Sequence, residues 1–456
     1  MAHRNLRAPA VILAALLAGC SGEHEALAAR VNAVMEPLVA AHEFSGAVVM
    51  TRKGRIIYQR GFGLANHAAN LPFTPETPAD GGSLAKTLTA AGIWQLAYEG
   101  RIDVDAPVQR YLREYPHAGT TVRHLISHSN GLPPYYEYWD PYFAPDEART
   151  TSRMLEIVAR ELPAPSFTPG SRFEYSNFGF DVAALVIERV SGLPIGTFLE
   201  RRFFSRFGME GTFARPARFA DWPGIRTMGY QWESGDWRVV DVYDLEAFIG
   251  ASNLYFPVAD LARWAGANAA GTAIAPAAYA AGQRHSLIGG RPSPITGLSW
   301  YCDDSGLHCY YTGSINAFHG LAYWDRETNE AIAFIANSAI PPWKTITLQR
   351  DLVAALAGRP LTQDTAAGFI PLDADARASL AGTWVADGRP ALTITGGEGG
   401  LRLREGDGLE FDAFQVSRDV FYVPGPDYWI AFSGPDGPST LHVRSMFVDF
   451  AAHRAR

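Results

Sequence analysis

The stretch from Gly81 to Gly100 constrains the fold most, because it is a helix start that carries a potential nucleophile. Gly81 and Gly82 give the backbone freedom for a tight turn, apolar residues then recur at helical spacing, and Gly100 stands where a left-handed C-cap is expected. Ser83 and Lys86 are three residues apart and therefore lie on one face of this helix. A neutral lysine can take the proton of a serine hydroxyl, although an N-cap serine beside a solvated lysine has the same pattern. Other segments must decide between these two interpretations.

The length of 456 residues predicts a large domain with an additional module. From about residue 361 the composition changes to Pro, Asp and Ala, and short segments of alternating apolar and polar residues follow. We therefore expect a main domain over residues 21–360, a linker over 361–378 and a small antiparallel β domain over 379–456. The net charge of −8 and the lack of a basic run argue against a nucleic-acid partner.

The N-terminus has the pattern of an export signal, with basic residues before a short apolar run. The run ends in Leu17-Ala18-Gly19-Cys20, which resembles the bacterial lipoprotein box, in which the cysteine becomes the lipidated first residue. We expect residues 1–20 to be a lipoprotein signal peptide, with a plainly cleaved signal as the alternative. A lipid on Cys20 would anchor the protein to a membrane. It would then lie in the periplasm or at the cell surface, and Ser21 favours the outer membrane.

The two remaining cysteines, Cys302 and Cys309, flank a polar, glycine-containing loop between aromatic, strand-like segments. In an exported protein a disulfide across this hairpin is favoured over two free thiols or a metal site. His124 and His128 have a spacing that can bind zinc on a helix, but no Glu follows the first histidine as in metalloproteases. We expect no metal and no other cofactor.

Apolar periodicity predicts the main elements around this stretch. A helix near 27–38 is expected to kink or stop at Pro37. An aromatic loop, Tyr135 to Phe143, has two interpretations, the lining of a pocket or a cover over the core, and the sequence favours neither. Other expected elements are strands at 46–50, 55–58 and 332–336 and helices at 182–190, from 260, and at 345–356.

Two further motifs strengthen the catalytic interpretation of Ser83. Tyr175-Ser176-Asn177 lies just before the helix at 182–190, so its outer two side chains can point into one cleft. Tyr311-Thr312-Gly313-Ser314 follows the cysteine loop on a predicted strand, where the glycine permits close approach of another backbone.

With these motifs in this order, the chain resembles the serine β-lactamase and penicillin-binding protein family, in the branch of class C β-lactamases, DD-peptidases and esterases. Framework stretches such as 103–108 and 125–133 support the resemblance, which covers about residues 30–357. It implies an α/β (α+β) fold, in which an antiparallel sheet built from both ends of this region is flanked by helices, with a helical subdomain between. A small all-β domain, a barrel or a sandwich, is expected to follow.

The resemblance also implies roles for individual residues. Ser83 would attack a carbonyl, while Lys86 and Tyr175 would share the proton transfers. Asn177 would hold the acyl side of the substrate, and the backbone N–H groups of Ser83 and Ser314 would form the oxyanion hole. Thr312 and Gly313 would belong to the substrate-binding strand.

Tyr311 departs from the family pattern, since a lysine or histidine usually occupies this position. A phenol carries no fixed positive charge for a substrate carboxylate. We therefore expect a serine hydrolase that forms an acyl-enzyme on an ester or a D-amino-acid-type amide. The alternatives are a DD-peptidase or β-lactamase, and a catalytically silent binding or scaffold lipoprotein.

Overall fold

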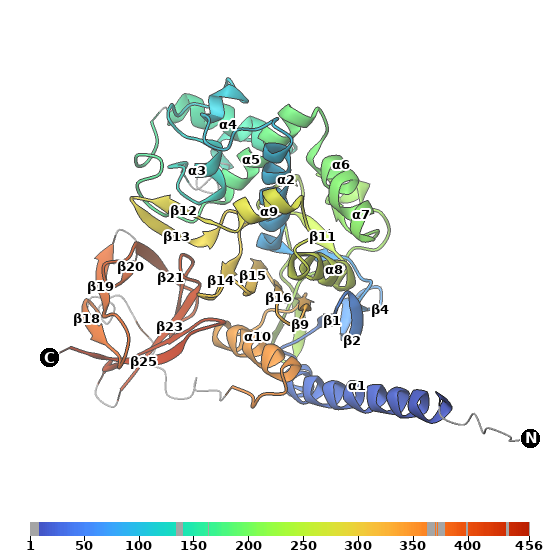
Figure 1. The fold of residues 1–456 in the computed structure, drawn as a ribbon. Helices are drawn as coiled ribbons and strands as arrows, with labels where there is room; N and C mark the ends of the chain where they lie inside the picture. Colours follow the sequence, from blue (N-terminus) through green and yellow to red (C-terminus); the bar gives the residue numbers. More distant parts are fainter. Residues whose placement is uncertain are drawn as a thin grey trace, which may run out of the picture.

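The computed structural model describes residues 9–133, 140–162, 164–362, 370, 372, 379–397, 400–434 and 437–455, with side chains from residue 22 onward. A large mixed domain is followed by a separate β-barrel, and the two lie side by side in Figure 1. The predicted fold class is confirmed: helices flank an antiparallel sheet built from both ends of the large domain, a helical subdomain lies between, and a C-terminal all-β domain follows.

The central six-stranded antiparallel sheet joins the two ends of the large domain. Its strand order is β14-β15-β16-β17-β1-β2, and Gly46 at the start of β1 pairs with Ala336 at the end of β17. Lys53 and Gly54 both have positive φ, of 50° and 72°, which gives the β1–β2 hairpin the backbone twist that two-residue turns prefer. The strands are β1 (Gly46–Arg52), β2 (Arg55–Phe62), β14 (Tyr301–Cys302), β15 (His308–Ile315), β16 (Phe318–Asp325) and β17 (Glu330–Ala336).

Helices cover the sheet, because every residue of β17 and all but the last of β1 are buried. Helix α8 (Val258–Ala269) packs on β1, β16 and β17, whereas α1 (Pro9–Ala40) packs on β2 and on α10 (Pro342–Leu356). Helix α1 continues through Pro37 and ends three residues later, so the expected interruption at this proline does not occur there.

The helical subdomain is inserted between the two halves of the sheet. Its centre is the contact between α2 (Ala85–Tyr98) and α5 (Asn177–Ser191), where Gly92 lies against Ile187 and Phe198. Gly100 and Gly192 follow α2 and α5 in the left-handed conformation that ends helices. The described residues also form the α-helices α3 (Val122–Ile126), α4 (Thr151–Glu161), α6 (Ile195–Leu199), α7 (Ser205–Phe207) and α9 (Pro276–Gly282), and a π-helix, Glu200–Phe204, joins α6 to α7.

Short strands complete the large domain and connect the sheet to the helical part. The small antiparallel sheet β5-β11-β7 lies next to the start of α2, where the Gly81 N–H donates to the carbonyl oxygen of Leu254 on β11 at 3.1 Å. The short strands are β3 (Leu64–Asn66), β4 (Leu71–Pro72), β5 (Ala79–Asp80), β6 (Arg149–Thr150), β7 (Phe213–Ala214), β8 (Tyr230–Glu233), β9 (Asp236–Val239), β10 (Glu246–Ala247), β11 (Leu254–Phe256), β12 (His285–Ile288) and β13 (Arg291–Thr296).

The C-terminal strands close into an eight-stranded barrel with its own core. Alternate residues point inward, as with Phe421 and Val423 of β22, and pack around Trp384. The strands are β18 (Gly382–Val385), β19 (Leu392–Gly397), β20 (Gly400–Glu405), β21 (Glu410–Gln415), β22 (Val420–Val423), β23 (Tyr428–Ser433), β24 (Thr440–Arg444) and β25 (Asp449–Arg454).

Polar and apolar contacts fix the barrel to the large domain. Arg350 on α10 donates to the carbonyl oxygen of Ser445 at 2.7 Å, and Tyr310 on β15 donates to Asp427 at 2.6 Å. Trp343 packs against Val420 and the neighbouring β23. The barrel is thus anchored on the same strand that carries Tyr311.

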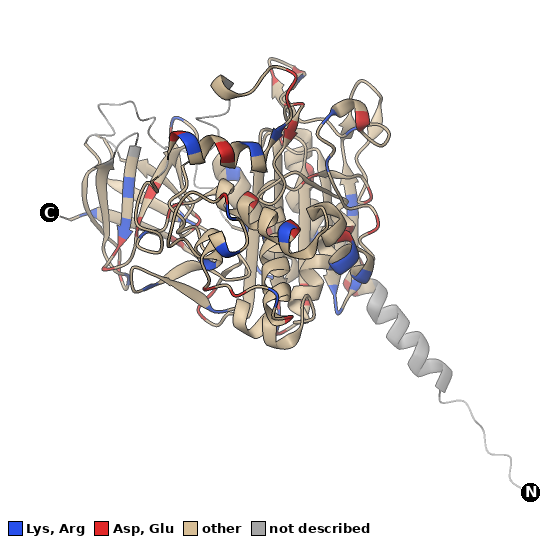
Figure 2. Cartoon of the chain, turned by 90° about the horizontal axis from the view of Figure 1, so that it is seen from above, with Lys and Arg blue, Asp and Glu red and all other residues tan. Residues whose placement is uncertain are grey.

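Charged residues of both signs are interspersed along the chain in Figure 2, so no single-sign face dominates that view. Among the described residues, no single helix is long and apolar enough to cross a membrane. One bent pair, Asn177–Ser191 with Ile195–Phe207, meets the length and composition test, but much of it belongs to the core.

Candidate functional site

Ser83 lies in a short 3-10 turn, Gly82–Leu84, immediately before α2. Asp80 fixes this turn, because its carboxylate accepts the Gly82 N–H at 2.8 Å. Burial raises the pKa of Asp80 to about 7. Gly82 has a φ of +52°, a conformation that favours glycine. The sequence singled out the glycines of this turn but not Asp80.

Lys86 is completely buried beneath Ser83. Its Nζ donates to Ser83 Oγ at 3.0 Å, to Asn177 Oδ1 at 2.7 Å and to the carbonyl oxygen of Ala251 at 2.9 Å. Three acceptors match the three donors of an ammonium group. Asp181 supports this arrangement by accepting the Ala251 N–H at 2.9 Å, and burial raises its pKa to about 7. Sequence analysis did not identify Asp181.

Tyr175 reaches Ser83 from the opposite side, with 2.8 Å between the two hydroxyl oxygens. Lys86 Nζ lies 5.1 Å from the centre of the Tyr175 ring. The next residue, Ser176, caps α5 by accepting the Gly179 N–H, and Asn177 begins the helix. The middle residue of the motif is therefore structural, while its neighbours face Ser83 and Lys86.

His128 supports Tyr175 from behind, with the two rings stacked at a centroid distance of 4.4 Å. Its Nδ1 accepts the Ser176 N–H at 3.0 Å. Burial, with a further contribution from Lys86, lowers the pKa of His128 well below 6.5, so this ring is neutral at pH 7. His124 instead bonds the backbone of Thr121 at the start of α3, and the two histidines do not form a common site. His124 therefore helps to cap α3, whereas His128 packs against Tyr175.

The edge of β15 forms the opposite wall of the site. Strand β14 pairs only with Cys309 and Tyr310, so the edge beyond them carries no strand partner among the described residues. A Cβ on Gly313 would lie 1.9 Å from the carbonyl oxygen of Gly81, and one on Gly82 would lie 2.9 Å from the Ser314 nitrogen. Glycine is therefore required at both positions for the backbones around Ser83 and Ser314 to meet.

Tyr311 is buried and stacks against Tyr301 at 5.5 Å. Burial and the adjacent Tyr175 raise the pKa of Tyr311 well above 10, so its phenol is neutral. His319, opposite Ser314 on β16, has its pKa lowered by burial to about 4. Neither residue supplies positive charge to this wall at neutral pH.

These residues surround a cavity of about 530 Å³. Ser83, Tyr175, Asn177 and the stretch 311–314 line it, with Lys86 beneath. No Lys or Arg lines this cavity in the described part of the chain, whereas two carboxylates do. The barrel also contributes lining residues that sequence analysis missed, because they belong to no motif: Asp412, Phe414, Val416, Tyr422, Pro424 and Trp429.

Cys302 and Cys309 form a disulfide that joins β14 to β15 outside the cavity. Of the aromatic loop, residues 135–139 lie outside the described residues, while Phe143 is part of the core. The Cys20 side chain also lies outside the described part.

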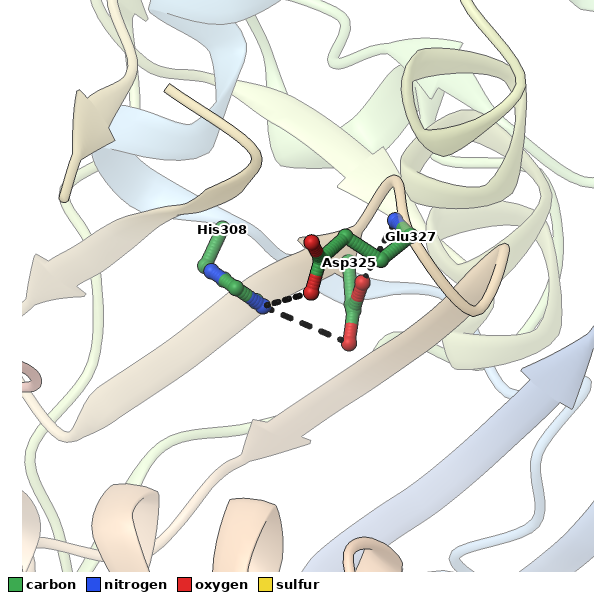
Figure 3. A group of neighbouring side chains, drawn as sticks. All are labelled: His308, Asp325 and Glu327. Carbon is green, nitrogen blue, oxygen red and sulfur yellow. Dashed lines mark hydrogen bonds and ion pairs between the residues drawn. The ribbon is translucent and has the colours of Figure 1, made fainter. Parts of the chain in front are cut away.

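A charge cluster near this disulfide involves His308, Asp325 and Glu327 (Figure 3). His308 Nε2 lies 3.6 Å from Asp325 and 3.7 Å from Glu327, and its Nδ1 bonds Asp303 at 2.8 Å. Both ring nitrogens of His308 therefore lie next to carboxylate oxygens. Its residues do not line the cavity at Ser83.

The family model described as Beta-lactamase matches residues 31–357. The chain is 30% identical over 179 residues to penicillin-binding protein 4* of Bacillus subtilis, covering 39% of this chain and 40% of that protein. It is 32% identical over 216 residues to esterase EstB of Burkholderia gladioli, covering 42% and 54%. A D-aminopeptidase of Brucella canis is 28% identical over 175 residues, covering 36% and 32%.

The matched region spans between about a third and a half of the length of these relatives. Among solved structures, the octameric penicillin-binding protein homologue from Pyrococcus abyssi aligns over 93% of this chain and 99% of its own, with a TM-score of 0.61 and 19% identity. That likeness concerns the fold and extends over most of the chain.

Proposed function

Because the chain belongs to the beta-lactamase family of serine hydrolases, we propose that it cleaves an ester or a D-amino-acid-type amide through an acyl-enzyme on Ser83. One observation carries this proposal: Ser83 Oγ lies 3.0 Å from Lys86 Nζ and 2.8 Å from Tyr175 Oη. A serine held between two proton-transfer groups is the arrangement that nucleophilic catalysis requires.

In the proposed reaction, Ser83 Oγ bonds to the substrate carbonyl carbon while its proton passes to the Tyr175 oxygen, which acts as a phenolate beside the ammonium group of Lys86. Tyr175 then returns a proton to the leaving group as the scissile C–O or C–N bond breaks. Water, deprotonated by the same pair, next attacks the acyl-enzyme and releases the acid. The ammonium group of Lys86 is placed to stabilise negative charge on Tyr175 during these transfers.

The developing oxyanion would accept hydrogen bonds from the backbone N–H groups of Ser83 and Ser314. The close contact of Gly82 with the Ser314 nitrogen brings these two backbones together. Preorganised donors of this kind contribute about 3 kcal/mol each to transition-state stabilisation.

The charge of the cavity favours a substrate without an obligatory carboxylate. Tyr311 and His319 are neutral at pH 7 for the reasons given above, and no Lys or Arg lines the cavity among the described residues. Esterase EstB and the Brucella D-aminopeptidase fit this substrate class by name. The similarity to a penicillin-binding protein supports a second candidate, a DD-peptidase or β-lactamase acting on cell-wall material.

Intact-protein mass spectrometry separates these candidates. Wild type and Ser83→Ala are each exposed to a fluorophosphonate and to a penicillin. We expect the fluorophosphonate to label wild type alone and penicillin to form no lasting adduct. A long-lived penicillin adduct, or rapid penicillin turnover, would favour the second candidate. No labelling of wild type by either reagent would contradict an activated Ser83 and support a silent scaffold.

We also propose that the protein is exported and anchored to a membrane, the outer one where a cell has two, through a lipid on Cys20. The support is the sequence pattern of residues 4–20. Metabolic labelling with a fatty-acid analogue tests this, with Cys20→Ser as the control. Labelling that persists in Cys20→Ser would contradict the proposal.

A further inference from the structure

The barrel presents an aromatic row to the cavity at Ser83. Phe414 of β21 pairs with Tyr422 of β22, and Tyr422 in turn pairs with Trp429 of β23. The Tyr422 and Trp429 rings are 5.0 Å apart. Because side chains alternate along a strand, these three residues point out of the barrel while their neighbours fill its core. The outside of the barrel is therefore mainly apolar where it meets the cavity, with Asp412 of β21 as a charged residue on the same face.

Part of this apolar surface is not covered by protein. Phe414 is 52% exposed and Val416, two residues further on the same face, is 43% exposed, and both line the cavity. Elsewhere on the same outer face, Val420 is covered by Trp343. The uncovered portion lies in the cavity that also contains Ser83, where a substrate group can cover it.

The turn between β22 and β23 fixes the row against the large domain. Asp427 is completely buried in this turn and accepts hydrogen bonds at 2.6 Å from Tyr310 of β15 and from Tyr422. Tyr301 donates to the carbonyl oxygen of Pro424 at 2.5 Å. The orientation of Tyr422 is thus tied to the strand that carries Tyr311, and the barrel wall has a defined position relative to Ser83.

From this geometry we infer that the barrel forms a specificity subsite, in which Phe414, Val416 and Trp429 bind an uncharged aromatic or branched aliphatic group of the substrate. The inference rests on the proposed function, because it concerns the same cavity. The two carboxylates in the lining, Glu174 and Asp412, are paired with Arg172 and Arg402, so the described lining offers no unpaired cation to an anionic group. A substrate with only a small acyl group does not contact the aromatic row and gains no binding free energy from it.

Ester selectivity tests the subsite. We compare the kcat/KM values for a phenylacetyl ester and an acetyl ester with the same leaving group. We expect wild type to prefer the phenylacetyl ester, and Phe414→Ala to lower the ratio of the two kcat/KM values about tenfold. Val416→Ala lowers it by about threefold. The matched control is Val385→Ala, a valine on β18 that is 44% exposed and does not line the cavity, and it should leave the ratio unchanged.

Binding of the phenylacetyl ester to Ser83→Ala, measured by calorimetry, separates failure of the subsite from failure of the proposed function. We expect the Kd to rise about tenfold when Phe414→Ala is added. Unchanged selectivity and unchanged binding in the Phe414 variants would overturn the subsite. If wild type hydrolyses neither ester but binding still depends on Phe414, the subsite stands and the proposed hydrolysis fails.

Discussion

The two walls of the cavity differ in how they are built. On the Ser83 wall, the buried Lys86 directs all three of its donors to named acceptors, and glycines allow contacts that no other residue permits. On the barrel wall, Phe414 and Val416 remain largely exposed and belong to no motif. Catalysis needs a fixed geometry, whereas an apolar contact tolerates variation in shape. The comparison suggests that one wall determines the chemistry and the other selects the substrate.

Removing the nucleophile should have the largest effect. Ser83→Ala leaves Lys86 with two acceptors, removes the attacking oxygen, and should lower kcat for ester hydrolysis by at least about a thousandfold. The fold should persist, as thermal unfolding can verify, because Ser83 is not part of the core. Activity within tenfold of wild type would place the chemistry elsewhere.

Tyr175→Phe isolates the proton-transfer hydroxyl. The ring can still stack on His128, but its 2.8 Å hydrogen bond to Ser83 is lost. We expect kcat to fall by about a hundredfold or more, with a smaller change in KM. Stopped-flow and steady-state kinetics provide both values. A loss that appears only in KM would assign Tyr175 to the recognition of substrate.

Gly313→Ala tests whether close backbone contact is necessary on the Ser83 wall. The new Cβ would lie 1.9 Å from the carbonyl oxygen of Gly81, so β15 must move away from Ser83. We expect kcat/KM to fall about tenfold or more and the protein to lose about 1–3 kcal/mol of stability. Gly396→Ala is the matched control, since a Cβ there meets nothing within 4 Å. Equal effects of the two substitutions would contradict this role of Gly313.

The turn that fixes the barrel wall should affect stability rather than turnover. Burial raises the pKa of Asp427 to about 6, against about 3.9 in an unfolded chain. Between these values the folded protein holds a proton that the unfolded chain has lost. This group therefore lowers stability as the pH rises from about 4 to about 6, and the loss is complete above that range.

Asp427→Asn removes this titration while retaining an acceptor. The free energy of unfolding of the variant, relative to wild type, should increase between pH 3.5 and pH 7 by on the order of 2–3 kcal/mol. Urea unfolding at several pH values measures the change. A difference that does not vary with pH would show that Asp427 does not titrate in this window.

The motifs of the Ser83 wall were recognisable from sequence because their residues act at short separations. Ser83 and Lys86 are neighbours on one turn, and Tyr175 and Asn177 flank a helix cap. The hairpin of β1 and β2 and the helices α5, α8 and α10 also followed from periodicity. The expected interruption at Pro37 was wrong, since the helix continues to Ala40.

The supporting residues of the site could not be predicted in this way. His128 and Asp181 act through burial and through contacts with Tyr175 and Ala251, which come from distant parts of the chain. The spacing of His124 and His128 is also compatible with zinc binding, although no Glu follows the first histidine. A local pattern cannot tell what a side chain will be buried against.

The sequence by itself predicted the fold class, through the resemblance that its ordered motifs carry, and a C-terminal β domain, through its alternating pattern. It also singled out Ser83, Lys86 and Tyr175 as the proposed catalytic group, because short motifs are local properties of the chain. Only the tertiary structure decided that this domain closes into a barrel and that Phe414, Tyr422 and Trp429 face Ser83. More than 300 residues separate Phe414 from Ser83 in the sequence. Their proximity depends on how the two hydrophobic cores pack against each other, which local sequence patterns cannot predict.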